Sequence, residues 1–235
     1  MSLARYVIDQ SVNILGWLLK NRKVTNLKSN TDGRICVNLG CGLAVMPGWT
    51  NVDASLNALF AGAPGLLLKF LYQLSGANRY YHLDVYCKIL IENRFIFHDL
   101  SRSLPFKPAS VDYFYSSHFF EHLFQDDAIR LLCEMRLALR NNGVVRIAIP
   151  DLFYAIGLYK TGEKCKMLDD YFFVSDRSSY LARHKYMYDF ELFSKLLSDA
   201  GYQNITKCAF GQGRVPNAKQ LDNRPADTLF VEAFR

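Results

Sequence analysis

The chain has 235 residues, half of them hydrophobic, and a formal net charge of +6 at pH 7. This length suits one α/β domain, and the scattered basic residues argue against a dedicated nucleic-acid-binding arm. Its six cysteines lie far apart and lack the spacing of a zinc site, so we expect reduced thiols in a cytosolic protein.

The N-terminal segment, residues 1–30, is expected to form an amphipathic helical extension. Its apolar stretch is interrupted by Arg5, Asp9 and Gln10, and it lacks a cleavage site of small residues. The segment therefore matches neither a signal peptide nor a membrane-spanning helix. Residues 31–235 are predicted to form a single domain.

Short apolar runs that stop at glycine or polar residues predict buried strands of a parallel sheet. The first four are Ile35–Leu39, Thr50–Asp53, Arg94–His98 and Val111–Ser116. The segment 54–93 is too long for an ordinary crossover, so we expect an insertion over the carboxyl edge of the sheet. Within it, "GAPGLLLKFLYQLSG" predicts a helix with an apolar face.

Helices and strands also alternate in the second half of the chain. Apolar spacing predicts a helix over Asp126–Arg140, and "NNG" supplies a left-handed stop before a strand over Val144–Ile149. Asp189 is expected to cap a helix that runs to Ala200. Two last strands, expected to pair as an antiparallel hairpin at one edge, cover Tyr202–Phe210 and Thr228–Phe234. This alternation predicts a parallel sheet with helices on both faces.

A glycine turn and an acid follow the first two strands. Gly40 and Gly42 lie where ligands bind in an open parallel sheet, and they allow close approach of a ligand to the backbone. Asp53, at the tip of the second strand, could accept hydrogen bonds from both hydroxyls of a ribose. A nicotinamide dehydrogenase would need a third glycine at position 45 and an acid about 20 residues further on. This chain has Val45 there and its acid, Asp53, comes too early, so it lacks both features.

Six segments resemble, in order, the motifs of class I S-adenosylmethionine-dependent methyltransferases of the methyltransferase type 11 group. They are "VNLGCG" with "NVDAS", "HDLSRSLPF", "VDYFYSSHFFEHL", "LLCEMRLALRNNGVVRIAIPDL" and "RHKYMYDFELFSKLLSDAGY". The resemblance implies a Rossmann-like three-layer sandwich, a seven-stranded mixed sheet with an antiparallel last strand, and S-adenosylmethionine as cofactor. One departure matters: between Gly42 and Asp53 the first helix of this fold has room for only a single turn.

The resemblance also implies which residues hold the cofactor. It assigns Asn38, Gly40, Cys41 and Gly42 to the methionine part, Asp53 to the ribose, Asp99 and Leu100 to the adenine, and Ser116 and His118 to the wall beside the sulfonium. Three of these residues have a structural alternative: Cys41 as a small filler, Asp53 as a turn former and Asp99 as a helix cap.

Methyl transfer needs an acceptor held in line with the sulfonium and, when the acceptor carries a proton, a base. His118 is a candidate base, with a role in the cofactor wall as the alternative. His184 or Tyr188 could bind substrate or act as base, or could belong to a loop held by its own aromatic residues. No metal is expected, because "HFFEH" lacks the glutamate directly after its first histidine that zinc peptidases use. Asp151 either contacts substrate or caps the next helix.

The predicted function is methyl transfer from S-adenosylmethionine to an oxygen or nitrogen of a small molecule or glycan precursor. The resemblance favours a sugar acceptor, since relatives are often found with cell-surface polysaccharide synthesis. The alternative is a catalytically inactive protein of this fold that docks to a membrane or partner through the N-terminal helix and "GLLLKFLYQL". An RNA methyltransferase would require basic residues around the mouth of the pocket. The expected location is cytoplasmic, with membrane association as an alternative, and the oligomeric state is left open.

Overall fold

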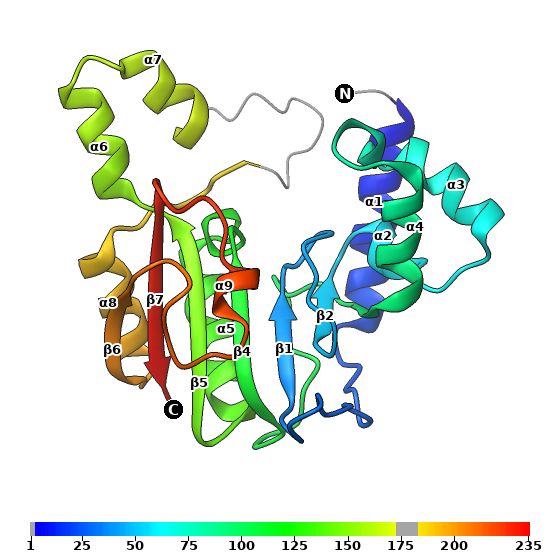
Figure 1. Ribbon diagram of the computed structural model, residues 1–235, viewed down its shortest axis with the longest axis horizontal. Helices are drawn as coiled ribbons and strands as arrows, with labels where there is room; N and C mark the ends of the chain where they lie inside the picture. Colours follow the sequence, from blue (N-terminus) through cyan, green and yellow to red (C-terminus); the bar gives the residue numbers. More distant parts are fainter. Residues whose placement is uncertain (1–2, 173–182) are drawn as a thin grey trace.

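The computed structural model describes residues 3–172 and 183–235. In these residues the strands form one seven-stranded sheet in the order β3-β2-β1-β4-β5-β7-β6 (Figure 1). They are β1 (Cys36–Leu39), β2 (Thr50–Asp53), β3 (Arg94–Phe97), β4 (Val111–Ser117), β5 (Leu139–Pro150), β6 (Gln203–Cys208) and β7 (Thr228–Phe234). Strands β1 to β5 pair in parallel, whereas β7 is antiparallel to β5 and β6. The predicted Rossmann-like fold and its antiparallel last strand are confirmed.

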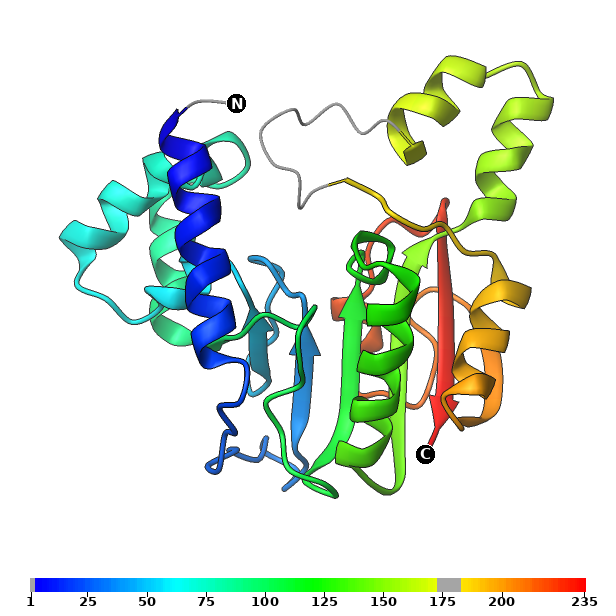
Figure 2. The same cartoon turned by 180° about the vertical axis from the view of Figure 1, so that it is seen from behind.

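Helices cover both faces of this sheet. On one face lie α5 (Gln125–Ala138) and α8 (Phe190–Asp199), in front in Figure 2, and on the other lies α9 (Ala218–Leu221), in front in Figure 1. Both long helices were predicted, and the Asp189 carboxylate caps α8 by accepting from the Leu192 N–H at 2.9 Å. In "NNG" the left-handed residue is Asn142, with φ of 64°, and the start of β5 includes it.

A loop covers the sheet face where the first helix of the fold was expected. Residues 41–49 form turns without a helix, so the single helical turn predicted after Gly42 is not present. Trp49 is buried and packs edge-on against Tyr115 of β4, with ring centroids 6.4 Å apart. Large apolar side chains of this loop thus provide the cover that a helix would otherwise give.

Four helices form a lobe on the β3 side of the sheet: α1 (Leu3–Leu19), α2 (Leu56–Leu59), α3 (Gly65–Leu74) and α4 (Leu83–Glu92). Leu68 and Leu71 of α3 pack with Tyr86 and Leu90 of α4 in a small core, against which Phe95 of β3 rests. The segment 54–93 therefore lies beside the outer strand, and it rises past the carboxyl ends of the strands only on that side (Figure 1).

A second helical group follows β5 on the opposite side of the same edge. It comprises α6 (Leu152–Lys160), α7 (Lys164–Met167) and a π-helical turn, η3 (Leu168–Phe172). The carboxyl edge of the sheet thus lies between two helical groups (Figures 1 and 2). No helix among the described residues has both the length and the apolar character needed to cross a bilayer.

Candidate active site

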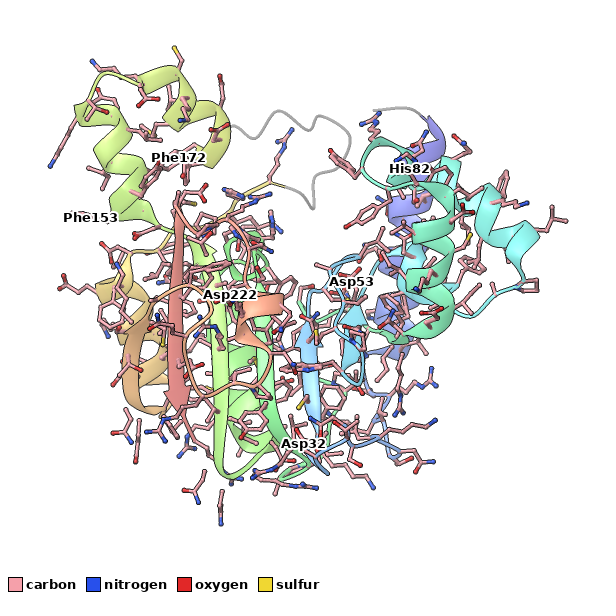
Figure 3. All side chains as sticks on the ribbon, in the orientation of Figure 1. Asp32, Asp53, His82, Phe153, Phe172 and Asp222 are labelled. Carbon is pink, nitrogen blue, oxygen red and sulfur yellow. The ribbon has the colours of Figure 1, made fainter. Side chains whose placement is uncertain are left out.

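The glycine turn and Asp53 form one hydrogen-bonded unit at the carboxyl edge of the sheet. The Gly42 N–H donates to Asp53 Oδ2 at 2.9 Å, and the Ser55 N–H donates to Oδ1 at 2.8 Å. Figure 3 shows Asp53 at the end of β2, between the two helical groups. Each carboxylate oxygen accepts about two hydrogen bonds, so both retain capacity for the hydroxyls of a ribose.

The two glycines of the turn differ in the space above them. A Cβ on Gly40 would lie 2.3 Å from Cγ of the Phe119 ring, whereas a Cβ on Gly42 would have no heavy atom of the described part of the chain within 4 Å. Both residues have positive φ angles, 62° and 53°, that favour glycine. A ligand can therefore approach the backbone at Gly42, while at Gly40 the missing side chain makes room for Phe119.

Three residues assigned to the cofactor by resemblance are buried and already bonded within the protein. The Asn38 amide donates to the Ala44 carbonyl and to Asn51 Oδ1, and the Ser116 hydroxyl donates to the Leu39 carbonyl at 3.0 Å. Burial raises the pKa of the Cys41 thiol well above its usual value, which disfavours a reactive thiolate. These side chains hold the turn and the strand ends in place.

Asp99 and Leu100 lie one strand further out, beneath α1. Asp99 Oδ1 accepts from the Ser101 N–H and hydroxyl, and Oδ2 accepts from Arg102 Nε at 2.8 Å. The Gly16 backbone of α1 is so close that a Cβ there would lie 2.8 Å from Asp99 Cβ. Oδ2 is therefore the Asp99 oxygen with capacity left for the exocyclic amine of adenine.

His118 follows β4 in a left-handed conformation, with φ of 49°. Such a φ is uncommon for a residue with a side chain and is found at functional sites, where the surrounding structure maintains it. The ring places Nε2 3.2 Å from Thr228 Oγ1 and Nδ1 3.5 Å from Glu121 Oε1. Glu121 is buried, with 1% of its side chain exposed, and neither carboxylate oxygen has a hydrogen-bond partner among the described residues.

A cavity of about 360 Å³ opens beside His118, at the ends of β5 and β7. Its lining is rich in polar side chains: His118, Pro150, Asp169, Asp170, Tyr171, His184, Arg224 and Asp227. Among the described residues, Tyr171 is the one Phe, Tyr or Trp side chain in this lining. A lining of carboxylates with one guanidinium suits hydroxyl or amino groups better than an apolar ligand.

His184 and Tyr188 lie in the same segment, but in different surroundings. His184 lines the cavity, and burial lowers the pKa of its imidazole, which favours the neutral ring. Tyr188 is 1% exposed, packs against Phe193 in the main core and does not line the cavity. Asp151 caps α6, since it accepts from the Phe153 N–H at 2.9 Å.

The structure thus brings the glycine turn, Asp53, Asp99 and His118 to one edge of the sheet. Sequence reasoning missed three carboxylates and one guanidinium of the cavity, from Asp169, Asp170, Asp227 and Arg224. They come from η3 and from the loop before β7, and no motif or spacing marks them. Glu121 belongs to "HFFEH", whose spacing does not match that of zinc peptidases.

A family model described as a methyltransferase domain matches residues 61–147. The resemblance to the class I S-adenosylmethionine-dependent methyltransferases is confirmed. The match runs from the segment after β2 into β5 and does not include the glycine turn. S-adenosylmethionine is the cofactor that this family uses, and the open backbone at Gly42 beside Asp53 fits its ribose and methionine parts.

Solved structures give looser likenesses. A methyltransferase from Thermotoga maritima is 14% identical, covers 99% of this chain and 91% of its own, and has a TM-score of 0.49. A methyltransferase from Archaeoglobus fulgidus is 14% identical, and the match covers 98% of this chain and 94% of the other, with a TM-score of 0.47. The chain spans only 50% of the methyltransferase SibL, at 18% identity, 86% coverage of this chain and a TM-score of 0.48. Structural similarities at this level give no information on the substrate. A comparison with curated proteins found no significant match.

Proposed function

We propose that this protein transfers the methyl group of S-adenosylmethionine to an oxygen or nitrogen of a small molecule or glycan precursor. The supporting observation is that consecutive residues join the glycine turn to the cavity. Phe119 lies against Gly40, and His118 lines the cavity. A cofactor at the turn would therefore have its sulfonium near His118, with the acceptor on the other side.

The cavity lining supports an acceptor rich in hydroxyl or amino groups. Asp169, Asp170 and Asp227 can accept hydrogen bonds from such groups, and Arg224 can donate to them. A sugar presents several hydroxyls at once, so a sugar-containing acceptor is the form we propose first. An RNA acceptor is less suited, because three carboxylates would face its phosphates.

His118 is the base that we propose. In the reaction a new bond forms from the acceptor atom to the methyl carbon, the carbon–sulfur bond breaks, and a hydroxyl acceptor gives up its proton. His118 can take that proton, and the nearby Glu121 carboxylate would stabilise the imidazolium that results. His184 and Tyr188 would then serve to bind substrate and to support the segment, respectively.

A single-turnover assay with methyl-labelled S-adenosylmethionine tests this function. Acceptors would be sugars and nucleotide sugars in one arm and amines in the other, with wild type, His118→Gln and Asp227→Asn compared. We expect transfer by wild type, a loss of about 10²- to 10⁴-fold in His118→Gln, and unchanged cofactor affinity in Asp227→Asn. Absence of transfer to every acceptor, with the cofactor bound, would favour the inactive docking protein.

Exposed apolar faces on two helices support a second function, attachment to the surface of an anionic bilayer. On α1 the exposed side chains include Ile14, Trp17 and Leu18, and on α3 they include Leu66, 85% exposed, and Phe70. Their spacing, three to four residues apart, puts each set on one side of its helix. Two lysines add positive charge to these faces. Lys20 lies over the Trp17 ring, and Lys69 lies in α3 between the apolar residues.

Such a surface would hold a cytoplasmic protein at a membrane without crossing it. Flotation with vesicles of phosphatidylcholine, with and without phosphatidylglycerol, tests this. We expect binding only to the anionic vesicles, and a clear loss in Leu66→Ser/Phe70→Ser. Failure of wild type to bind either vesicle would leave these faces to a protein partner and overturn the membrane proposal.

A further inference from the structure

Two histidines and a glutamate that are far apart in sequence meet beside the cavity. Glu121 and His122 belong to η2 (Phe120–His122), and His184 lies 62 residues after His122. One ligand atom from each of the three side chains lies within 4.8 Å of those of the other two. The backbone fixes this meeting, because the N–H groups of Lys185 and Tyr186 both donate to the Glu121 carbonyl.

The hydrogen bonds of the two imidazoles fix which nitrogen carries the proton. His122 Nδ1 lies 3.2 Å from the Arg183 carbonyl oxygen, and His184 Nδ1 lies 2.6 Å from the Tyr171 carbonyl oxygen. A carbonyl oxygen can only accept, so Nδ1 is the donor in both rings. Nε2 is then left to present a lone pair, an arrangement that is typical of histidines bound to a metal.

Glu121 supplies the negative charge at the centre of the cluster. Its side chain is 1% exposed, and neither oxygen accepts a hydrogen bond from residues 3–172 or 183–235, although a buried carboxylate without a partner is costly. His122 Nε2 lies 3.8 Å from Oε1. Three groups that offer lone pairs therefore converge on one point. Among the described residues, the potential donor that faces them is the His118 ring, whose Nδ1 lies 3.5 Å from Glu121 Oε1.

Two kinds of positive charge could satisfy this cluster, a metal ion or a proton on an imidazole. A charge-assisted hydrogen bond would bring nitrogen and oxygen to about 2.7–2.9 Å. Two ligands of a tetrahedral zinc ion, each bonded at about 2.0–2.2 Å, lie about 3.4 Å apart. The nitrogen–oxygen distances to Glu121 Oε1, 3.5 Å from His118 Nδ1 and 3.8 Å from His122 Nε2, are both too long for such a hydrogen bond. The 3.8 Å between the two proposed ligand atoms, His122 Nε2 and Glu121 Oε1, is close to the ligand separation around zinc.

We infer that Glu121, His122 and His184 bind a divalent transition-metal ion, with Zn²⁺ as the best match. Two imidazoles and one carboxylate are a ligand set that zinc uses, and three protein ligands leave one coordination position open. His184 also lines the cavity, so the open position would face the space proposed for the acceptor. Metal binding does not depend on methyl transfer and can be measured without it.

Calorimetric titration of tag-free, chelator-treated protein with ZnCl₂, and visible absorption of the protein with Co²⁺, test this site. Wild type should bind one Zn²⁺ per chain and give the d–d bands of four-coordinate Co²⁺. Glu121→Gln and His184→Gln should each lose at least about a hundredfold in affinity. His82→Gln, which changes an exposed histidine at the start of α4 (Figure 3), should bind like wild type.

Thermal melts separate loss of the metal site from loss of the fold. Zn²⁺ should raise the Tm of wild type, because the ion binds the folded state, and should not raise that of Glu121→Gln. Without metal, Glu121→Gln should be at least as stable as wild type, since it removes an unpaired buried charge.

The exposed thiols of Cys133 and Cys165 are the rival ligands. Zinc binding that survives Glu121→Gln and His184→Gln, or that is lost in Cys133→Ser/Cys165→Ser, would overturn the inference.

Discussion

The backbone N–H of Gly42 donates a hydrogen bond to Oδ2 of Asp53, so the glycine turn and the acid hold each other in place. The N–H of Ser55 holds the other oxygen, Oδ1, from the opposite side. The carboxylate is thereby fixed before any cofactor arrives, and binding need not pay for its ordering. Both the affinity of the site for a ribose and the shape of the glycine turn should thus depend on Asp53.

Gly40→Ala should destabilise the protein. The new Cβ would meet the Phe119 ring at 2.3–2.6 Å, and alanine would also have to adopt a φ of 62°. Overpacking costs about 1–3 kcal/mol and the left-handed conformation about 1–2 kcal/mol, so we expect a loss of roughly 2–5 kcal/mol in the free energy of unfolding, measured in urea.

Gly33→Ala is the control for this substitution. Gly33 has a φ of 74°, but no described residue has a heavy atom within 4 Å of an added Cβ, so only the conformational cost of about 1–2 kcal/mol applies. The double variant Gly40→Ala/Phe119→Ala should recover part of the stability lost in Gly40→Ala, relative to Phe119→Ala alone. Equal losses in Gly33→Ala and Gly40→Ala would show that Phe119 does not restrict residue 40.

Arg146→Met should be strongly destabilising. The Arg146 guanidinium is fully buried in β5 and pairs with Asp222 at 2.5 Å and with Glu232 at 3.1 Å. Removing it would leave two buried carboxylates without their cation, at a cost of about 3–5 kcal/mol. Lys195→Met breaks the exposed pair with Asp199 and should cost less than about 1 kcal/mol. Urea unfolding checks both, and similar losses would contradict the assignment of Arg146 to the core.

Burial lowers the pKa of His98 from its ordinary value of 6.5, and the ring bonds to Ser103 Oγ at 2.9 Å. Below pH 6.5 the unfolded chain therefore binds a proton that the folded protein does not, so stability falls as the pH drops. His98→Gln should lessen this fall, which urea unfolding at about pH 7.5 and 5.5 would show. Equal pH dependence in both proteins would mean that His98 contributes nothing to it.

Much of the fold could be predicted from the sequence, because the strands are short apolar runs with clear ends. β2 and β7 have the predicted bounds, and β1 and β3 differ by one residue at one end. The loop after Gly42 was harder to predict, since a helix and a set of turns both satisfy the same spacing. What decides between them is the burial of Trp49 against Tyr115, a contact made across the sheet.

The candidate site divides in the same way. Gly42 and Asp53 could be found because eleven residues and one strand join them, so sequence order alone places them together. The cluster of Glu121, His122 and His184 could not be found from the sequence. His184 lies 62 residues after His122, and backbone hydrogen bonds from the residues that follow it to the Glu121 carbonyl bring it to the cluster. Tyr188 was predicted to belong to the site because of its position in the sequence, but its side chain is buried in the core.

Calorimetric titration with S-adenosylmethionine and S-adenosylhomocysteine, for wild type and Asp53→Ala, tests the central claim most directly. Asp32→Ala is the matched control, because Asp32 is exposed and lies at the opposite edge of the sheet (Figure 3). We predict binding by wild type and by Asp32→Ala, and a loss of about ten- to hundredfold in Asp53→Ala, as expected for a carboxylate that accepts hydrogen bonds from a ribose. Equal affinity in all three proteins, or no binding by wild type, would contradict a cofactor site at the Gly42 turn.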